Sequence, residues 1–87
     1  MAEIIENDKG FKVIKVSLDE VIVKFKGFGI CDSCNGRPKA FMYIPVLHSC
    51  YCQKCFNKWY ADAINYTEDR NFENKAFAVA KKLLNLK

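Results

Sequence analysis

The chain has few of the residues from which most enzyme active sites are built. Its 87 residues include one histidine and contain no evident serine, histidine and aspartate set for nucleophilic catalysis. A glycine-rich loop that could bind phosphate is missing, and so are paired carboxylates beside an apolar pocket pattern. We therefore expect a protein that is not an enzyme. The one catalytic alternative is a thiol redox protein with a reactive Cys-x-x-Cys pair at the start of a helix.

Long apolar runs and a basic leader are missing as well. No run of about 18 apolar residues occurs, which argues against a membrane-spanning helix. The first residues include Glu3 and Glu6, where a secretory or mitochondrial leader would need positive charge. The sequence therefore predicts a soluble, cytoplasmic protein that does not associate with membranes.

The chain is short for a protein that must build its own core. A domain of about this length buries only roughly 60 to 65% of its unfolded surface, so a metal ion would be a useful additional constraint. Apolar residues make up 51% of the chain and aromatic residues 14%, which excludes a disordered chain. We expect a single zinc-binding domain over residues 1–87, in the α+β class.

The cysteines are spaced in a pattern that is typical of metal-binding sites. Four of the five cysteines form two Cys-x-x-Cys pairs, Cys31 with Cys34 and Cys52 with Cys55, and 17 residues separate the pairs. A two-residue gap lets one turn direct both sulfurs at a common point, and two such turns complete a tetrahedron around a metal ion. The pattern predicts one structural Zn²⁺ per chain on these four ligands. Disulfides, redox cysteines and an iron–sulfur centre are the alternatives.

A closed four-cysteine site has two consequences for the rest of the protein. It has no open position for water or substrate, which again argues against catalysis. Structural zinc contributes roughly 10 to 16 kcal/mol in small metal domains, so we expect the metal-free chain to be largely unfolded. The formal net charge of +4 falls to about +2 when four thiolates bind one zinc ion.

The N-terminal part of the sequence has β character. Residues 1–10 are polar, end in an Asn-Asp-Lys-Gly turn, and are predicted to be a flexible lead-in. Residues 11–17 are rich in β-branched side chains and predict a strand. Residues 18–26 fit two structures, because three consecutive β-branched residues favour a hairpin, whereas Ser17 and Glu20 form a capping box that starts a helix. The N-terminal β hairpin is the favoured interpretation, and a strand followed by a short helix is the alternative.

The rest of the chain predicts a second hairpin and two helices. Residues 40–44 and 47–51 are short extended segments that would connect the two cysteine pairs. A helix then starts around Cys52, and a C-terminal helix over residues 67–87 starts at Thr67, whose hydroxyl would cap it. The apolar face of the first helix comprises Phe56, Trp59, Tyr60, Ala63 and Ile64. The apolar face of the second comprises Phe72, Ala76, Val79, Ala80 and Leu83.

A cysteine knuckle followed by a hairpin and by a cysteine pair that enters a helix resembles the treble-clef zinc finger. In the knuckle, Asn35 and Gly36 can supply the positive φ angles that a tight turn around a metal needs. The resemblance covers about residues 29–66 and implies a zinc core. Carried over to this chain, it places Cys31 and Cys34 in the knuckle, Cys52 at the helix start and Cys55 one turn later. Treble-clef modules bind DNA, RNA, proteins or lipids, so the resemblance does not specify an activity.

His48 and Cys50 lie just before the second cysteine pair. The resulting His-x-Cys-x-Cys-x-x-Cys run is similar to part of a RING domain, but a RING needs eight ligands, and five cysteines with one histidine are too few. We expect Cys50 to be a buried small apolar residue and His48 to lie at the surface. The alternatives are that one of them replaces an assigned ligand, or that both share a metal between two chains.

Two surfaces are candidates for binding. The outer face of the first helix carries exposed polar residues, and together with Arg37 and Lys39 it would form a small basic surface, although an ordinary solvated face is the simpler interpretation. Its members are Lys54, Asn57, Lys58, Ala61 and Asp62. The C-terminal helix has further apolar residues outside its main face, namely Phe77, Leu84 and Leu86, which predicts burial on two sides or a partner interface.

The aromatic residues near the zinc segment are expected to fill the core rather than to stack on bases. They are Phe28, Phe41, Tyr43, Tyr51 and Trp59. Since the charge with zinc bound is modest and apolar surface is generous, the sequence predicts a small zinc-stabilised binding module with a protein partner. A nucleic-acid-binding zinc finger is the alternative, and a homodimer is one form the protein partner could take. Short zinc-knuckle chains rich in lysine and asparagine resemble small zinc-binding proteins of bacteria and their phages.

Overall fold

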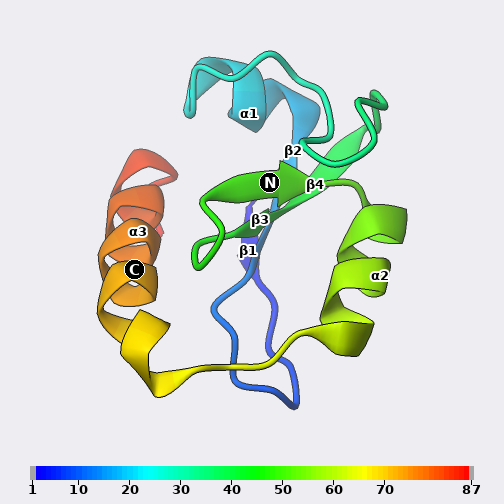
Figure 1. The fold of residues 1–87 in the computed structure, drawn as a ribbon. Helices are drawn as coiled ribbons and strands as arrows, with labels where there is room; N and C mark the ends of the chain where they lie inside the picture. The colour runs from blue at the N-terminus through cyan, green and yellow to red at the C-terminus, as the bar shows by residue number, and fades with distance from the viewer. Residues whose placement is uncertain (1, 87) are drawn as a thin grey trace.

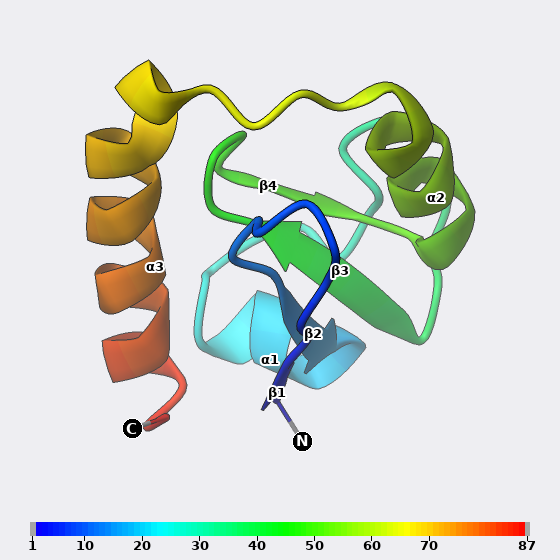
Figure 2. The same cartoon turned by 90° about the horizontal axis from the view of Figure 1, so that it is seen from below.

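A short antiparallel sheet organises the chain in the computed structural model, which describes residues 2–86. Within these residues the sheet has four strands, which lie side by side in chain order: β1 (Glu3–Ile4), β2 (Ile14–Ser17), β3 (Ala40–Ile44) and β4 (Ser49–Tyr51). Three α-helices surround it: α1 (Leu18–Val23), α2 (Gln53–Asp62) and α3 (Arg70–Leu83), the last preceded by the 3₁₀ helix η1 (Thr67–Asp69). Figures 1 and 2 show α2 and α3 on opposite sides of the sheet. The predicted α+β class is confirmed.

Strand β3 is buried on both faces, which makes it the centre of the fold. Its side chains alternate between two apolar clusters, as the period of two in a strand requires. One cluster joins β2 and β3 to α1 and α3, and its members include Ile14, Val16, Val21, Phe41, Tyr43 and Ala80. The other joins β3 and the segment just before β2 to α2, and it comprises Phe11, Val13, Met42, Ile44 and Phe56. The predicted second hairpin, formed by β3 and β4, and the helix after Cys52 are therefore present.

Residues 18–23 form a helix, so the favoured prediction of a strand in this segment is wrong and the strand-plus-helix alternative holds. The Glu20 backbone N–H donates to Ser17 Oγ at 3.2 Å, and Glu20 Oε1 accepts from the Ser17 backbone N–H at 2.9 Å. This capping box, together with burial of Val21, outweighs the weak strand propensity of the β-branched residues. Ile22 and Val23 remain exposed.

An N-terminal hairpin does form, but it uses residues that the sequence analysis assigns to a flexible lead-in. Glu3 and Ile4 pair with Lys15 and Ile14 in antiparallel register. The turn between the strands is tied to the end of α2, because Lys9 Nζ donates to the carbonyl oxygens of Tyr60 and Ala63. A lysine at the C-terminus of a helix satisfies free carbonyls and opposes the negative end of the helix dipole.

The helical segment begins at Thr67 as predicted, but its first three residues form η1, α3 itself starts at Arg70, and α3 presents a different face to the core. No side chain caps η1 or α3, so the expected capping role of Thr67 is not observed. Phe72, Val79 and Leu83 are exposed rather than buried, whereas Glu73 is only 3% exposed. The Glu73 carboxylate accepts the Lys12 backbone N–H at 2.9 Å, and this bond helps to fix the rotation of the helix.

None of the helices in residues 2–86 has the length and apolar character needed to span a bilayer.

The capping box at the start of α1 can be tested by substitution. We expect Ser17→Ala to lower the free energy of unfolding by about 0.5 to 2 kcal/mol, because it removes the side-chain oxygen that accepts the Glu20 backbone N–H. Thr67→Ala is the matched control and should change it by less than about 0.5 kcal/mol. Urea unfolding followed by circular dichroism measures both, and equal effects of the two substitutions would contradict the assigned role of Ser17.

Candidate metal centre

The first cysteine pair lies in a tight loop between α1 and β3. The Asn35 backbone N–H donates to the Cys31 carbonyl at 2.9 Å, and the Cys31 N–H donates to the Gly36 carbonyl at 2.8 Å. Asn35 adopts a φ of 62°, as predicted for this knuckle, and asparagine tolerates this left-handed conformation better than most residues, whereas Gly36 does not adopt the positive φ that was also expected of it. At Gly36 a Cβ would lie 3.3 Å from Cys34 Sγ, so the absence of a side chain leaves room for the thiol.

The second cysteine pair is held where β4 passes into α2. Cys52 is the N-cap residue of α2, and Cys55 follows in the first turn. The Phe56 backbone N–H donates to the Cys52 carbonyl at 2.9 Å, which closes this turn. Both positions agree with those expected from the sequence.

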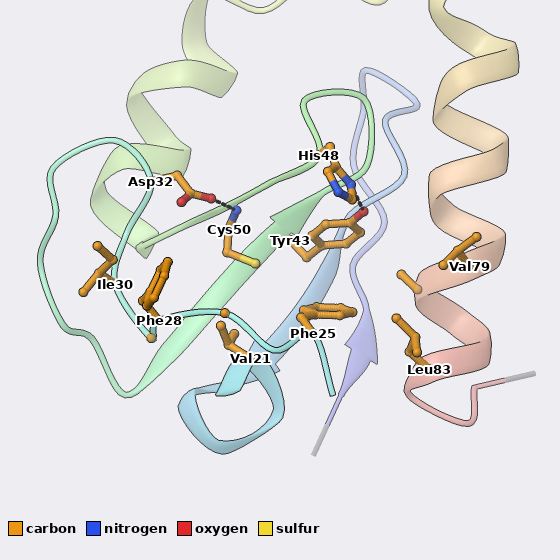
Figure 3. A pocket seen from close by; sticks show the side chains of 13 residues that line it. Val21, Phe25, Phe28, Ile30, Asp32, Tyr43, His48, Cys50, Val79 and Leu83 are labelled. Carbon is orange, nitrogen blue, oxygen red and sulfur yellow. Dashed lines mark hydrogen bonds between the residues drawn. The ribbon is translucent and has the colours of Figure 1, made fainter. Parts of the chain in front are cut away.

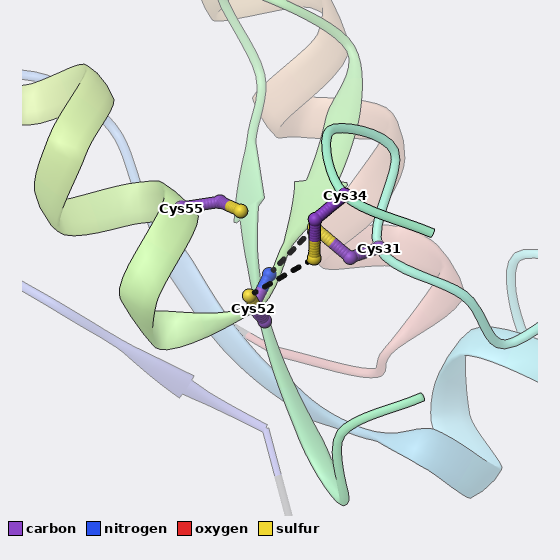
Figure 4. Close-up of side chains that lie close together, drawn as sticks. All are labelled: Cys31, Cys34, Cys52 and Cys55. Atoms are coloured by element: carbon purple, nitrogen blue, oxygen red, sulfur yellow. Dashed lines mark hydrogen bonds between the residues drawn. The ribbon is translucent and has the colours of Figure 1, made fainter. Parts of the chain in front are cut away.

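The structure brings the four predicted ligands together (Figure 4). The sulfur atoms of Cys31, Cys34, Cys52 and Cys55 all lie within 4.8 Å of one another, and Cys34 Sγ is 3.8 Å from Cys52 Sγ. Ligands of a tetrahedral ion with bonds of about 2.3 Å are separated by roughly 3.8 Å, so the cluster is close to the required size. All five cysteines are free thiols. Free thiols can bind a metal ion, whereas a disulfide framework would have paired them. The four residues could hold one metal ion.

The electrostatics of the cluster also favour a cation. Burial raises the pKa of the Cys31 thiol, but hydrogen bonds from the backbone of Cys34, Cys52 and Ser33 outweigh burial and lower this pKa to about 6. A hydrogen bond with Ser33 lowers the pKa of the Cys55 thiol, whereas the neighbouring sulfurs, led by that of Cys52, raise it to about 12. The Cys31 thiolate therefore forms readily, whereas Cys55 resists ionisation beside the neighbouring sulfurs. A bound cation removes the repulsion between ionised sulfurs.

His48 and Cys50 lie outside the cluster. His48 is exposed in the turn between β3 and β4, as expected, and its Nδ1 is 3.0 Å from the Tyr43 hydroxyl. Cys50 is half-buried, and burial, followed by the charge of Asp32, raises the pKa of its thiol to about 12. These environments agree with the expectation that neither residue belongs to the four-cysteine set within one chain.

Asp32 is a residue of this region that the sequence analysis does not identify. Its carboxylate accepts the Cys50 backbone N–H at 2.7 Å, and its own N–H donates to the Cys50 carbonyl at 2.9 Å. This reciprocal pair fastens the knuckle to β4 and helps to bring the two cysteine pairs together. A single aspartate between two cysteines carries no sequence signal for such a role.

The candidate basic surface is exposed as predicted, with Lys54, Asn57 and Lys58 on the outer face of α2 and with Arg37 and Lys39 in the loop before β3.

The expectation that the aromatic residues pack in the core holds for Phe41 and Tyr43. It is wrong for Phe28, which is 89% exposed. Phe28 borders a cavity of about 290 Å³ between the knuckle, α1 and α3 (Figure 3), which periodicity in the sequence does not reveal.

Comparison with protein-family models, with curated proteins and with solved structures finds no match to this chain.

Proposed function

We propose that the chain is a non-enzymatic protein-binding module whose fold is stabilised by one structural Zn²⁺. The convergence of four cysteine sulfurs is the observation that supports the metal. Four thiolates in a closed tetrahedral set are typical of structural zinc sites and leave no position for a substrate. Free thiols also fit a reducing compartment such as the cytoplasm.

The zinc ion would act as the link between the knuckle, β4 and α2. The order of these elements, a cysteine knuckle, a β hairpin and a helix that begins at the second cysteine pair, supports a treble-clef-like core over residues 29–66. The N-terminal strands and α3 would then be additions to this core. In this arrangement the metal stabilises the module and does not take part in binding.

Exposed apolar surface is the observation that favours a protein partner. Phe28, Val79 and Leu83 line the same cavity, and they are 89%, 59% and 43% exposed. Exposed apolar side chains that gather around a hollow are typical of protein interaction sites.

Nucleic acid is the second candidate partner, because Lys54 and Lys58 lie together on α2. The modest net charge with zinc bound makes it the weaker of the two.

Zinc binding can be tested by replacing single cysteines. We expect Cys52→Ser to lose the metal or to bind it much more weakly, because it removes one of four ligands. Cys50→Ser and His48→Gln are the matched controls and should each retain one zinc ion per chain. Native mass spectrometry of the purified proteins reports metal content and assembly state together. Loss of zinc from either control would show that the assigned ligand set is wrong.

Removal of zinc should unfold most of the chain. The core is small, and metal binding of roughly 10 to 16 kcal/mol in comparable domains exceeds the stability that such a core supplies alone. We expect the far-ultraviolet circular dichroism signal to collapse on addition of a chelator and to return when zinc is restored. A native spectrum in excess chelator would contradict a folding role for the metal.

The proposed class of partner can be tested by parallel selections on the zinc-loaded protein. One uses random short peptides displayed on phage, and the other uses pools of random DNA and RNA oligonucleotides. We expect peptides to be enriched, and we expect any oligonucleotide binding to be weak and to fall steeply with salt. Enrichment of oligonucleotides with no enrichment of peptides would overturn the protein-binding proposal in favour of the nucleic-acid alternative.

A further inference from the structure

The cavity beside Phe28 has a shape and a chemistry that specify more than protein binding in general. We infer that it receives a tryptophan or tyrosine side chain from an acidic segment of a protein partner. This inference rests on the proposed protein-binding function and adds to it the docking site and the chemistry of the partner.

The size of the cavity fits one aromatic side chain. Its volume is about 290 Å³, and an apolar cavity of about 150 Å³ is already large enough to bind benzene. Apolar side chains from α1, the following loop and α3 form most of its wall (Figure 3). These side chains are Val21, Phe25, Phe28, Ile30, Val79 and Leu83. An indole or phenol ring would therefore lie against apolar atoms on several sides.

The loop that carries Phe28 is held in a defined conformation. The Gly27 backbone N–H donates to the Val21 carbonyl at 2.9 Å, and Gly29 adopts a φ of +73°. A Cβ at Gly29 would come within 2.7 Å of Leu18 Cδ1, so the loop packs against α1 in a way that requires glycine. Phe28 is thus held exposed at the rim by a packed loop, and its apolar surface stays available for a partner.

Polar groups in the wall favour an aromatic ring that carries a donor. One oxygen of the Asp32 carboxylate accepts the Cys50 N–H, and the carboxylate has further lone pairs that can accept. The Tyr43 hydroxyl and His48 Nδ1 bond to each other at 3.0 Å in the same wall. An indole N–H or a phenol O–H can donate to such acceptors, whereas phenylalanine or leucine would cover them without a hydrogen bond. The wall therefore favours tryptophan and tyrosine.

The charges around the cavity favour acidic residues beside that aromatic. Lys75 and Lys82 are exposed and share the outer face of α3 with Val79, since they lie four residues before it and three after it. Lys24 and Lys26 are also exposed, one residue before and one residue after Phe25, which lines the cavity. Among the described residues that line the cavity, Asp32 is the one carboxylate. Carboxylates that flank the bound aromatic would be attracted by these lysines.

The same lysines argue against a second copy of the chain as the occupant. In a two-fold dimer the same surface patch is used by both chains, so each lysine-bearing rim would face its own copy. Like charges that face each other across an interface are unfavourable. An acidic segment that carries an aromatic residue, supplied by another protein, fits both the apolar cavity and the exposed lysines next to its lining residues in the chain.

The test uses the peptide most enriched in the selection above, labelled with a fluorophore and titrated with the zinc-loaded full chain. We expect this peptide to contain tryptophan or tyrosine flanked by acidic residues, and we expect replacement of that aromatic by alanine to abolish binding. Phe28→Ala and Val79→Gln in the protein should weaken binding by about tenfold or more, as for the central residues of an interface. Ile64→Gln is the control, because Ile64 is 64% exposed and lies outside the cavity, and it should leave affinity within about twofold.

A second pair of variants tests the charge. Lys75→Gln/Lys82→Gln should weaken binding roughly 3- to 10-fold at low salt, and the difference from wild type should shrink as salt is added. Lys54→Gln/Lys58→Gln removes the same charge from α2, on the other side of the sheet, and should have little effect (Figure 1). Circular dichroism of each variant establishes that it is folded.

The outcomes separate this inference from the function on which it rests. Equal binding of the peptide to wild type and to the Phe28 and Val79 variants would overturn the docking site and leave the protein-binding function standing. Enriched peptides without an aromatic or without acidic residues would overturn the chemistry of the partner. A dimer in sedimentation that Phe28→Ala dissociates would show that a second copy occupies the cavity and would overturn the inference. If no peptide is enriched, the proposed function fails together with the inference.

Discussion

The convergence of four cysteine sulfurs is the constraint on which the rest of this structure depends. The knuckle over residues 31–36 has no regular secondary structure; backbone hydrogen bonds shape it, and it contributes two thiols to the cluster. At the other end, α2 has no side chain that caps its first turn, and Cys52 occupies the N-cap position. Sulfurs at this distance repel each other once they are ionised, and a cation among them would remove that repulsion.

The candidate metal centre and the cavity are parts of one structure rather than two independent sites. Cys31 is fully buried in the cluster that contains Tyr43, and the next residue, Asp32, lines the cavity. On β4, Cys50 lines the cavity two residues before Cys52 joins the sulfur cluster. The hydrogen bonds between Asp32 and Cys50 connect these two segments. A metal that fixes the knuckle against β4 would therefore also fix one wall of the cavity.

The sequence was most informative where a local pattern determines the structure. The cysteine spacing identified the four sulfurs that meet, and helical periodicity identified α2, because both patterns depend on residues close together in the chain. The hairpin prediction at residues 18–23 is wrong because the Ser17 and Glu20 capping box outweighs the strand propensity of the β-branched residues. Strand β1 and the contact of Lys9 with the end of α2 arise from partners distant in the chain, and no local pattern reports them. The cavity is built from four separate segments and is likewise beyond any such pattern.

The orientation of α3 connects these observations to the proposed function. Apolar periodicity alone would turn Phe72, Val79 and Leu83 inward, where their burial would add to a small core. The helix instead buries Glu73. A buried carboxylate needs a hydrogen-bonding partner, and the Lys12 backbone N–H donates to this one. This rotation leaves Val79 and Leu83 exposed at the edge of the cavity, with Lys75 and Lys82 beside them. Burial of Val79 and Leu83 would add to the core of an isolated domain, so their exposure beside a cavity is the feature on which the proposed protein-binding function rests.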